Sequence, residues 1–212
     1  MTRRIVVLTA GLSQPSSTRL LADRLADAVT AQIGARGESA QVEVIELREL
    51  AHDLATTMTT GGMPTPAVER ARETVAGADA LIAVTPVFAA SYSGLFKMFV
   101  DVLEPESIAG TPVLVAATAG TARHQLVLDH ALRPLFSYLR AAVVPSGVFA
   151  ATDDFGGPGS AELGRRITRA AEEMAGAVVS AGVEGFAPAA ARRRDRAEEP
   201  TDFADLLASL GQ

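Results

Sequence analysis

A segment rich in hydroxyl side chains precedes the first helix that the sequence predicts. Between Gly11 and Arg19 it carries Ser13, Ser16, Ser17 and Thr18. A helix N-terminus presents N–H groups without an intrahelical partner and about half a positive charge, so hydroxyls placed there complete an anion site. We interpret the segment as a seat for a phosphate monoester, with Arg19 as a bidentate partner. The alternative is a simple N-cap formed by Ser16 or Ser17, which needs only one hydroxyl.

This segment lacks the two glycine patterns that hold larger nucleotides. Neither G-x-G-x-x-G, which lets a helix approach a pyrophosphate, nor G-x-x-x-x-G-K-[ST], which wraps a triphosphate, follows the first apolar run. A dinucleotide or a nucleoside triphosphate bound in the usual way is therefore disfavoured.

A second segment, Thr85 to Gly94, combines a proline, two aromatic side chains and a glycine. Phe88 and Tyr92 offer flat apolar walls, and the N–H groups between them can bind the edge of a heteroaromatic ring. A site that binds a flavin ring requires such walls and donors. The alternative is a structural loop with its aromatic side chains packed inward, which stays open for Phe88 and is less favoured for Tyr92 because of its polar tip.

A third segment, Ala117 to His124, is rich in small residues. They let backbone N–H groups approach the pyrimidine side of a flavin, which gains negative charge on reduction. His124 is a possible further donor, or else a cap or surface residue. His52 and His130 show no metal-ligand spacing with carboxylates, so we interpret both as structural or surface groups and expect no metal site.

Five apolar runs alternate with amphipathic segments and predict a parallel sheet. The predicted strands are Ile5–Thr9, Val42–Leu47, Ala80–Thr85 (ending at Pro86), Pro112–Ala117 and Val143–Ala150. The predicted helices are 19–33, 66–77, 94–103, 124–139 and 161–181, with Pro134 expected to kink or restart the fourth.

These elements predict an α/β fold of the flavodoxin-like class. It is a three-layer sandwich with a five-stranded parallel sheet in the order 2-1-3-4-5 and helices on both faces. In this topology ligands bind outside the carboxyl ends of the strands, near the switch point between strands one and three. The three segments described above follow strands one, three and four, so we expect them to form one site.

Composition limits the remaining classes of function. With 212 residues, one domain is expected at 1–186, and no apolar run is long enough to span a bilayer. The chain has no cysteine, which excludes thiolate chemistry and fits a cytoplasmic location. A net charge of −6 makes nucleic acid a poor partner.

The last part of the chain, 187–212, is predicted to be a flexible tail. Residues 188–200 have the composition of a disordered linker, and the arginines at 192–194 and 196 are followed at once by two glutamates. Phe203, Leu206, Leu207 and Leu210 then have the spacing of a short amphipathic helix.

The three segments together resemble the NAD(P)H-dependent FMN reductases. The matching residues are Gly11 to Arg19, Thr85 to Lys97, and Thr118 to Thr121 with His124. The second match is the most specific, because Pro-x-aromatic-x-x-Ser-Tyr-x-Gly ahead of an apolar helix is uncommon. Within the family, the chain looks most like the reductases that accompany luciferase-like flavin monooxygenases.

This resemblance implies FMN as cofactor, NADPH or NADH as co-substrate, and hydride transfer by the bound flavin without a catalytic side chain. It assigns Ser13, Ser17, Thr18 and Arg19 to the FMN phosphate. It places Pro86, Val87, Phe88, Ala89, Ser91 and Tyr92 along the ring, and Thr118, Ala119, Gly120 and Thr121 at its polar edge. It also implies a homodimer or homotetramer, which Phe96, Phe99, Leu135 and Phe136 would support, and a flavin-dependent monooxygenase as partner.

Three other functions stay open at this point. The first is an FMN-containing quinone, azo or metal-ion reductase that keeps its flavin. A flavodoxin-like electron carrier without hydride activity is the second, although such carriers are generally more acidic. The third is a flavin-free binding or regulatory module.

Overall fold

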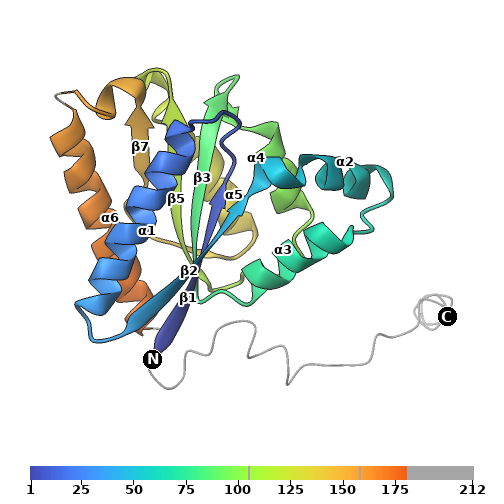
Figure 1. Ribbon diagram of the computed structural model, residues 1–212, viewed down its shortest axis with the longest axis horizontal. Helices are drawn as coiled ribbons and strands as arrows, with labels where there is room; N and C mark the ends of the chain where they lie inside the picture. The colour runs from blue at the N-terminus through green and yellow to red at the C-terminus, as the bar shows by residue number, and fades with distance from the viewer. Residues whose placement is uncertain (105, 158, 181–212) are drawn as a thin grey trace, which may run out of the picture.

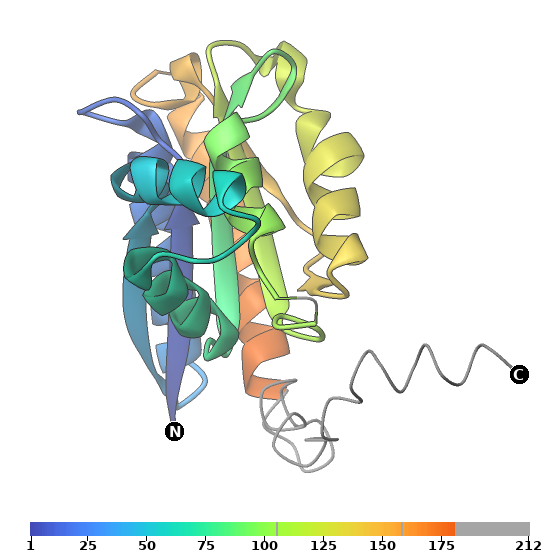
Figure 2. The ribbon, with the colours of Figure 1, turned by 90° about the vertical axis from the view of Figure 1, so that its right-hand side faces the viewer.

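The computed structural model describes residues 1–104, 106–157 and 159–180. Within them a twisted sheet is covered by helices on both faces (Figures 1 and 2). Its strands are β1 (Thr2–Thr9), β2 (Ser39–Glu46), β3 (Ala80–Phe88), β4 (Ser91–Tyr92), β5 (Pro112–Ala119), β6 (Ala142–Val143) and β7 (Val148–Ala151). The main path runs β2-β1-β3-β5-β6, with β7 also beside β5, and these pairings are all parallel. This confirms the predicted flavodoxin-like order.

The predicted fifth strand, Val143–Ala150, is divided in the structure into β6 and β7. Both pair with β5, but Pro145 lies between them and has no N–H group to donate to a strand pairing. Gly147 follows, and a Cβ at this position would lie 3.3 Å from the Val115 carbonyl oxygen. The proline and this close approach account for the interruption.

The helices are α1 (Ser17–Gly34), α2 (Ala51–Thr59), α3 (Pro66–Ala76), α4 (Gly94–Asp101), α5 (Arg133–Tyr138) and α6 (Ser160–Ser180). The helix predicted over 124–139 is interrupted in the structure. It is replaced by the 3-10 turn η2 (Ala122–His124), the π-helical turn η3 (Leu128–Leu132) and α5. Pro134 lies in the first turn of α5, where its missing N–H costs nothing, so the helix restarts there as expected.

Two hydrophobic cores lie on opposite faces of the sheet, because successive side chains of a strand point in opposite directions. Ile5 and Val7 of β1 pack with α1 and α6, whereas Val6 and Leu8 pack with the side that carries α2 to α5. Figure 1 shows α1 and α6 on one side of the sheet. The loops that follow the strands are therefore held on a rigid, doubly covered sheet.

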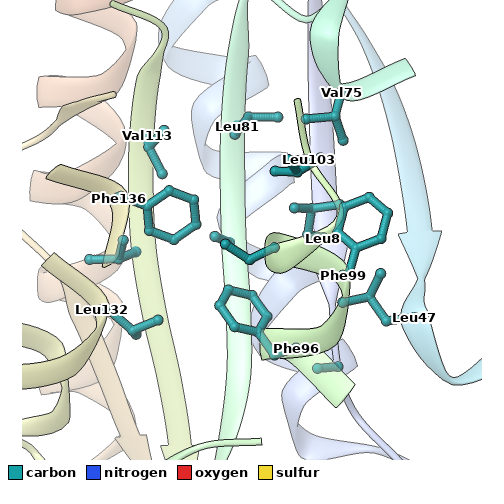
Figure 3. Packing of buried hydrophobic residues seen from close by; sticks show 14 of the residues in the cluster. Leu8, Leu47, Val75, Leu81, Phe96, Phe99, Leu103, Val113, Leu132 and Phe136 are labelled. Atoms are coloured by element: carbon teal, nitrogen blue, oxygen red, sulfur yellow. The ribbon is translucent and has the colours of Figure 1, made fainter. Parts of the chain in front are cut away.

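The aromatic side chains of α4 and α5 belong to the core. Phe96, Phe99 and Phe136 have no exposed surface and meet Leu81 and Val113 of the sheet (Figure 3). The prediction that these three support an interface between subunits is therefore wrong. Their helical spacing was correctly read as one apolar face, but this face covers the sheet. Leu135, the fourth residue of that prediction, is only half-buried.

None of the helices in the described ranges combines the length and apolar character that crossing a bilayer requires. The predicted tail at 187–212, with its linker and amphipathic helix, lies outside the described residues.

Candidate active site

The three segments singled out in the sequence meet at the carboxyl ends of β1, β3 and β5, at the upper edge of the sheet in Figure 1. Ala10, directly after β1, donates its N–H to the Val84 carbonyl of β3 at 3.0 Å. Pro86 of β3 pairs in register with Thr118 of β5. The strand order thus brings together residues that lie far apart in the sequence.

The first segment forms the N-terminus of α1 in the geometry of an anion site. Ser16 is the N-cap, and its Oγ accepts the Arg19 N–H at 3.2 Å. No acidic residue occupies the first turn of the helix. Ser13 and Ser17 are exposed, whereas Thr18 is buried. Ser16 therefore has the capping role of the simpler interpretation, and the exposed hydroxyls of Ser13 and Ser17 are left for a ligand.

Gly11 gives this loop its shape. A Cβ at Gly11 would lie 2.1 Å from the Ser16 Oγ and 3.2 Å from the Thr18 Cβ. No side chain fits there unless the cap serine moves, so only glycine lets the chain after β1 lie against the start of α1. The sequence indicated a glycine-containing loop but not this contact.

A buried hydrogen bond joins the first segment to the third. The hydroxyl oxygens of Thr18 and Thr118 are 2.8 Å apart, and both residues are 3% exposed. The two predicted ligands of different parts of the flavin therefore bind each other through their side chains. This bond fixes the distance between the N-terminus of α1 and the loop after β5.

Arg19 does not reach across the phosphate seat. Its Nε donates to Asp23 at 2.7 Å, and its Nη1 donates to Glu46, which also accepts from Arg48 Nε at 2.7 Å. Hydrogen bonding to Asp23 raises the pKa of Arg19 above its usual value. A bidentate contact with phosphate would require Arg19 to exchange one of these carboxylates. Glu46, which comes from the edge strand β2, gave no sequence signal of this role.

The second segment is a hairpin, which corrects the prediction that the third strand ends at Pro86. β3 continues to Phe88 and turns through Ala89 and Ala90 into β4. The two alanines have φ angles of 48° and 65°, which is the left-handed region that a two-residue hairpin of this kind demands. Because alanine rarely adopts this conformation, the surrounding structure must hold the turn.

A buried hydroxyl anchors the base of this hairpin. Thr85 Oγ1 accepts the Ser93 N–H at 3.0 Å, and Ser93 in turn caps α4 by accepting the Phe96 N–H at 3.1 Å. Tyr92 is half-buried, with its ring centroid 6.1 Å from that of Phe96, whereas Phe88 is 48% exposed. Phe88 is therefore available as an apolar wall, and Tyr92 is held against the core.

The third segment becomes progressively more exposed beyond Thr118. Ala119 is half-buried, and Gly120 and Thr121 are exposed at the end of β5, beside the register partner Pro86. Only small side chains cover the backbone here, as the sequence predicted. His124 closes the short turn η2 and is half-buried.

The donor set fits a flavin mononucleotide. No residue of the three segments is acidic, although the chain as a whole has a charge of −6. Thr9, at the end of β1, is 1% exposed, and its hydroxyl has no hydrogen-bond partner among the described residues. By strand alternation it lies on the face covered by α1. Neutral donors with no competing carboxylate suit a phosphate, and the hairpin and the small-residue loop suit a planar ring.

Comparison with known proteins agrees with this geometry. The family model described as NADPH-dependent FMN reductase matches residues 3–156, which include all three segments. The chain is 41% identical over 170 residues to the NADH-dependent FMN reductase SfnE of Pseudomonas putida, covering 79% of this chain and 88% of the relative. It is 38% identical over 176 residues to an FMN reductase (NADPH) of Pseudomonas aeruginosa, covering 81% and 90%.

Among solved structures, an oxidoreductase from Corynebacterium diphtheriae shares 55% sequence identity with this chain. It superimposes with a TM-score of 0.81 over 84% of this chain and 98% of that protein. The same fold therefore occurs in a protein described as an oxidoreductase.

Proposed function

The chain belongs to the NADPH-dependent FMN reductase family, and from this premise we propose that it reduces FMN and releases it to a flavin-dependent monooxygenase. As a member of the family it is an oxidoreductase that uses FMN together with NADH or NADPH. We further propose which residues bind the flavin and that the chain associates with a second copy of itself.

In the proposed site, Ser13, Ser16, Ser17 and the amides of the first turn of α1 hold the FMN phosphate. This assignment is supported by the absence of acidic residues in that turn and by the fit of Gly11 against Ser16.

Thr18 acts mainly through its hydrogen bond to Thr118, which positions the loop after β5. Arg19 contributes positive charge nearby while remaining paired with Asp23 and Glu46.

The ring is proposed to lie between the β3–β4 hairpin and the loop after β5. Pro86, Val87, Phe88, Ala89, Ser91 and Tyr92 supply the first wall, and Ala119, Gly120 and Thr121 supply backbone amides on the other side. An FMN held between these two walls would supply the hydride chemistry, and the residues named here would orient its ring and leave one face open to the nicotinamide. The amides of the exposed loop favour reduction because they donate to the side of the ring that becomes negative.

The proposal that reduced FMN is released is supported by the kind of hydrogen-bond donors that are available to its phosphate. The guanidinium of Arg19 is already bound by two carboxylates, so the phosphate relies mainly on neutral hydroxyl and amide groups. Charge-assisted hydrogen bonds are roughly twice as strong as neutral ones, so this seat holds FMN less tightly than one with an unpaired arginine. A modest affinity suits a protein that passes reduced FMN to another enzyme.

The single observation that carries the proposal is the meeting of three loops of suitable chemistry at the carboxyl ends of β1, β3 and β5. The test measures oxidation of NADH and NADPH by the purified protein with and without added FMN, with a quinone as the competing acceptor. We expect oxidation to depend on free FMN and to support a flavin-dependent monooxygenase added in excess. Turnover with quinone at constant bound FMN would favour a quinone reductase, and no oxidation would favour an electron carrier.

Self-association is the remaining proposal. Leu135 borders a groove of about 440 Å³ between α4 and α5, together with Leu103, Leu139 and Tyr138, and Tyr138 is 85% exposed. We expect a second copy of the chain to cover this groove. Light scattering on the wild type and on Tyr138→Glu measures the subunit number, which the substitution should reduce.

A further inference from the structure

A second hollow lies beside the proposed ring site and has a different chemical character. It measures about 310 Å³ and lies between the β3–β4 hairpin, represented by Ala90 and Ser91, and the turns η2 and η3. Three basic or imidazole side chains line it: Arg123, His124 and His130. No carboxylate is among its lining residues.

These three side chains have no hydrogen bond or ion pair to any residue in the described part of the chain. The carboxylate closest in sequence to His130, Asp129, is bound by Arg133 Nε at 2.9 Å, and Arg133 also donates to the Val144 carbonyl at 2.9 Å. Arg140, which follows α5, is likewise paired with Glu106, at 2.7 Å. In a chain with a charge of −6, a cavity edged by an unpaired arginine and two imidazoles is a local site for an anion.

The hollow is distinct from the proposed seat for the FMN phosphate. That seat belongs to α1, which packs on the face of the sheet shared with α6. The hollow belongs to η3, whose Leu128 and Leu132 pack on the opposite face with Phe136 of α5. Both open at the carboxyl edge of the sheet, and Ser91 belongs to the hollow as well as to the proposed ring wall. A planar ring across this edge would therefore have an anion site on each side.

We propose that this hollow binds phosphate groups of the reduced nicotinamide co-substrate, with Arg123 as the principal ligand and His124 and His130 as additional donors. The inference rests on the proposed function, because it needs the nicotinamide to approach a flavin held at the neighbouring loops. The pyrophosphate is common to NADH and NADPH, whereas the 2′-phosphate occurs only in NADPH. A guanidinium donates two parallel hydrogen bonds to either group. Leu126, which is 58% exposed at the same hollow, offers apolar surface for the attached nucleoside.

The experiment compares the wild type with Arg123→Glu, Arg123→Lys and His130→Gln. Arg70→Glu is the matched control, because Arg70 is exposed on α3, has no partner among the described residues, and undergoes the same change of charge. Calorimetric titration with NADP⁺ and with NAD⁺ reads binding without turnover. Steady-state kinetics give KM and kcat for both reduced nucleotides, and a fluorescence titration gives the affinity for FMN.

We expect Arg123→Glu to weaken NADP⁺ binding and raise the KM for NADPH at least about fivefold, and Arg123→Lys to restore part of the loss. His130→Gln should have a smaller effect in the same direction, and Arg70→Glu none. FMN affinity should stay constant throughout. A loss limited to NADP⁺ and NADPH identifies the 2′-phosphate as the ligand, and an equal loss with NAD⁺ and NADH identifies the pyrophosphate.

Unchanged nucleotide binding and KM in Arg123→Glu, with normal FMN reduction, would overturn this inference and leave the proposed function intact. A wild-type protein that binds FMN but oxidises neither nucleotide would instead overturn the proposed function. An equal effect of Arg70→Glu would show that only the overall charge matters, and would also overturn the assignment of Arg123.

Discussion

The hydroxyl oxygens of Thr18 and Thr118 lie 2.8 Å apart in the interior, although the two residues are separated by 100 positions in the sequence. One belongs to the first turn of α1 and the other to the end of β5. The bond joins the two parts of the site that are proposed to hold the phosphate and the polar edge of the ring. The geometry of the proposed flavin site thus depends on a direct contact between two protein side chains.

Removal of one hydroxyl of this pair should lower the free energy of unfolding more than removal of both. Thr118→Val leaves the Thr18 hydroxyl buried without a partner, so the free energy of unfolding should fall by about 1–3 kcal/mol. The double variant Thr18→Val/Thr118→Val leaves no unpaired hydroxyl, so it should lose less than either single variant and therefore less than the sum of the two. Urea unfolding of the three variants measures this. Thr9→Val is the control, because its hydroxyl already lacks a partner and its removal should leave stability unchanged or higher. Additive losses would contradict a direct bond.

Gly11→Ala should weaken the N-terminus of α1. The new methyl group would force the Ser16 Oγ out of its capping position, which costs about 1 kcal/mol of stability. Gly34→Ala is the matched control at the end of the same helix, since its Cβ would meet nothing within 4 Å. Gly11→Ala should therefore unfold at a lower temperature and bind FMN more weakly than Gly34→Ala, as measured by thermal unfolding and FMN titration. Equal behaviour of the two variants would show that the close approach of Gly11 and Ser16 has no energetic role.

Ala90→Gly should stabilise the protein, because glycine adopts the left-handed conformation of this turn without steric cost. The expected gain is roughly 1 kcal/mol in the free energy of unfolding. The same change at Ala31, which is exposed in α1, should cost about 1 kcal/mol because glycine disfavours a helix. Chemical denaturation should therefore give a higher free energy of unfolding for Ala90→Gly and a lower one for Ala31→Gly. A loss at both positions would argue against the left-handed turn.

Stability should fall in acid partly through Glu38. A hydrogen bond from Arg3 lowers the pKa of Glu38 in the folded protein. The stabilisation that ionised Glu38 provides is therefore fully present above its pKa in the unfolded chain, about 4.3, and is lost as the pH falls through its lower pKa in the folded protein. Glu38→Gln should flatten the pH dependence of the unfolding free energy below about pH 4.3, whereas Glu172→Gln, at an exposed position on α6, should not. Identical profiles for the two variants would contradict this assignment.

The parts of the fold that follow from local pattern were predictable. Runs such as Ala80–Thr85 and Pro112–Ala117 are buried on both faces, and their alternation with helices indicates a parallel sheet with helices on both sides. The restart at Pro134 follows from its missing N–H. The end of the third strand was predicted wrongly, because Pro86 was taken as its last residue and the strand continues to Phe88. The turn that follows consists of Ala89 and Ala90, and neither is a residue type that usually indicates a hairpin turn.

Contacts between distant segments were not predictable from the sequence. Nothing near Arg19 in the sequence indicates that Glu46 binds its guanidinium, and nothing near Thr18 points to Thr118. The aromatic face of α4 was correctly identified as apolar, but periodicity cannot tell whether such a face covers a sheet or a second subunit. The types of residue in the site could therefore be predicted, while the partners of their side chains required the structure.

The proposed phosphate seat at α1 is measured most directly by the preference for FMN over riboflavin, since riboflavin lacks only the phosphate. Fluorescence titrations of both ligands should show much tighter binding of FMN by the wild type. The preference should shrink in Ser17→Ala and in Ser13→Ala, with riboflavin affinity unchanged. Equal affinity of the wild type for FMN and riboflavin, or a preference that survives both substitutions, would show that α1 and its serines do not hold the FMN phosphate.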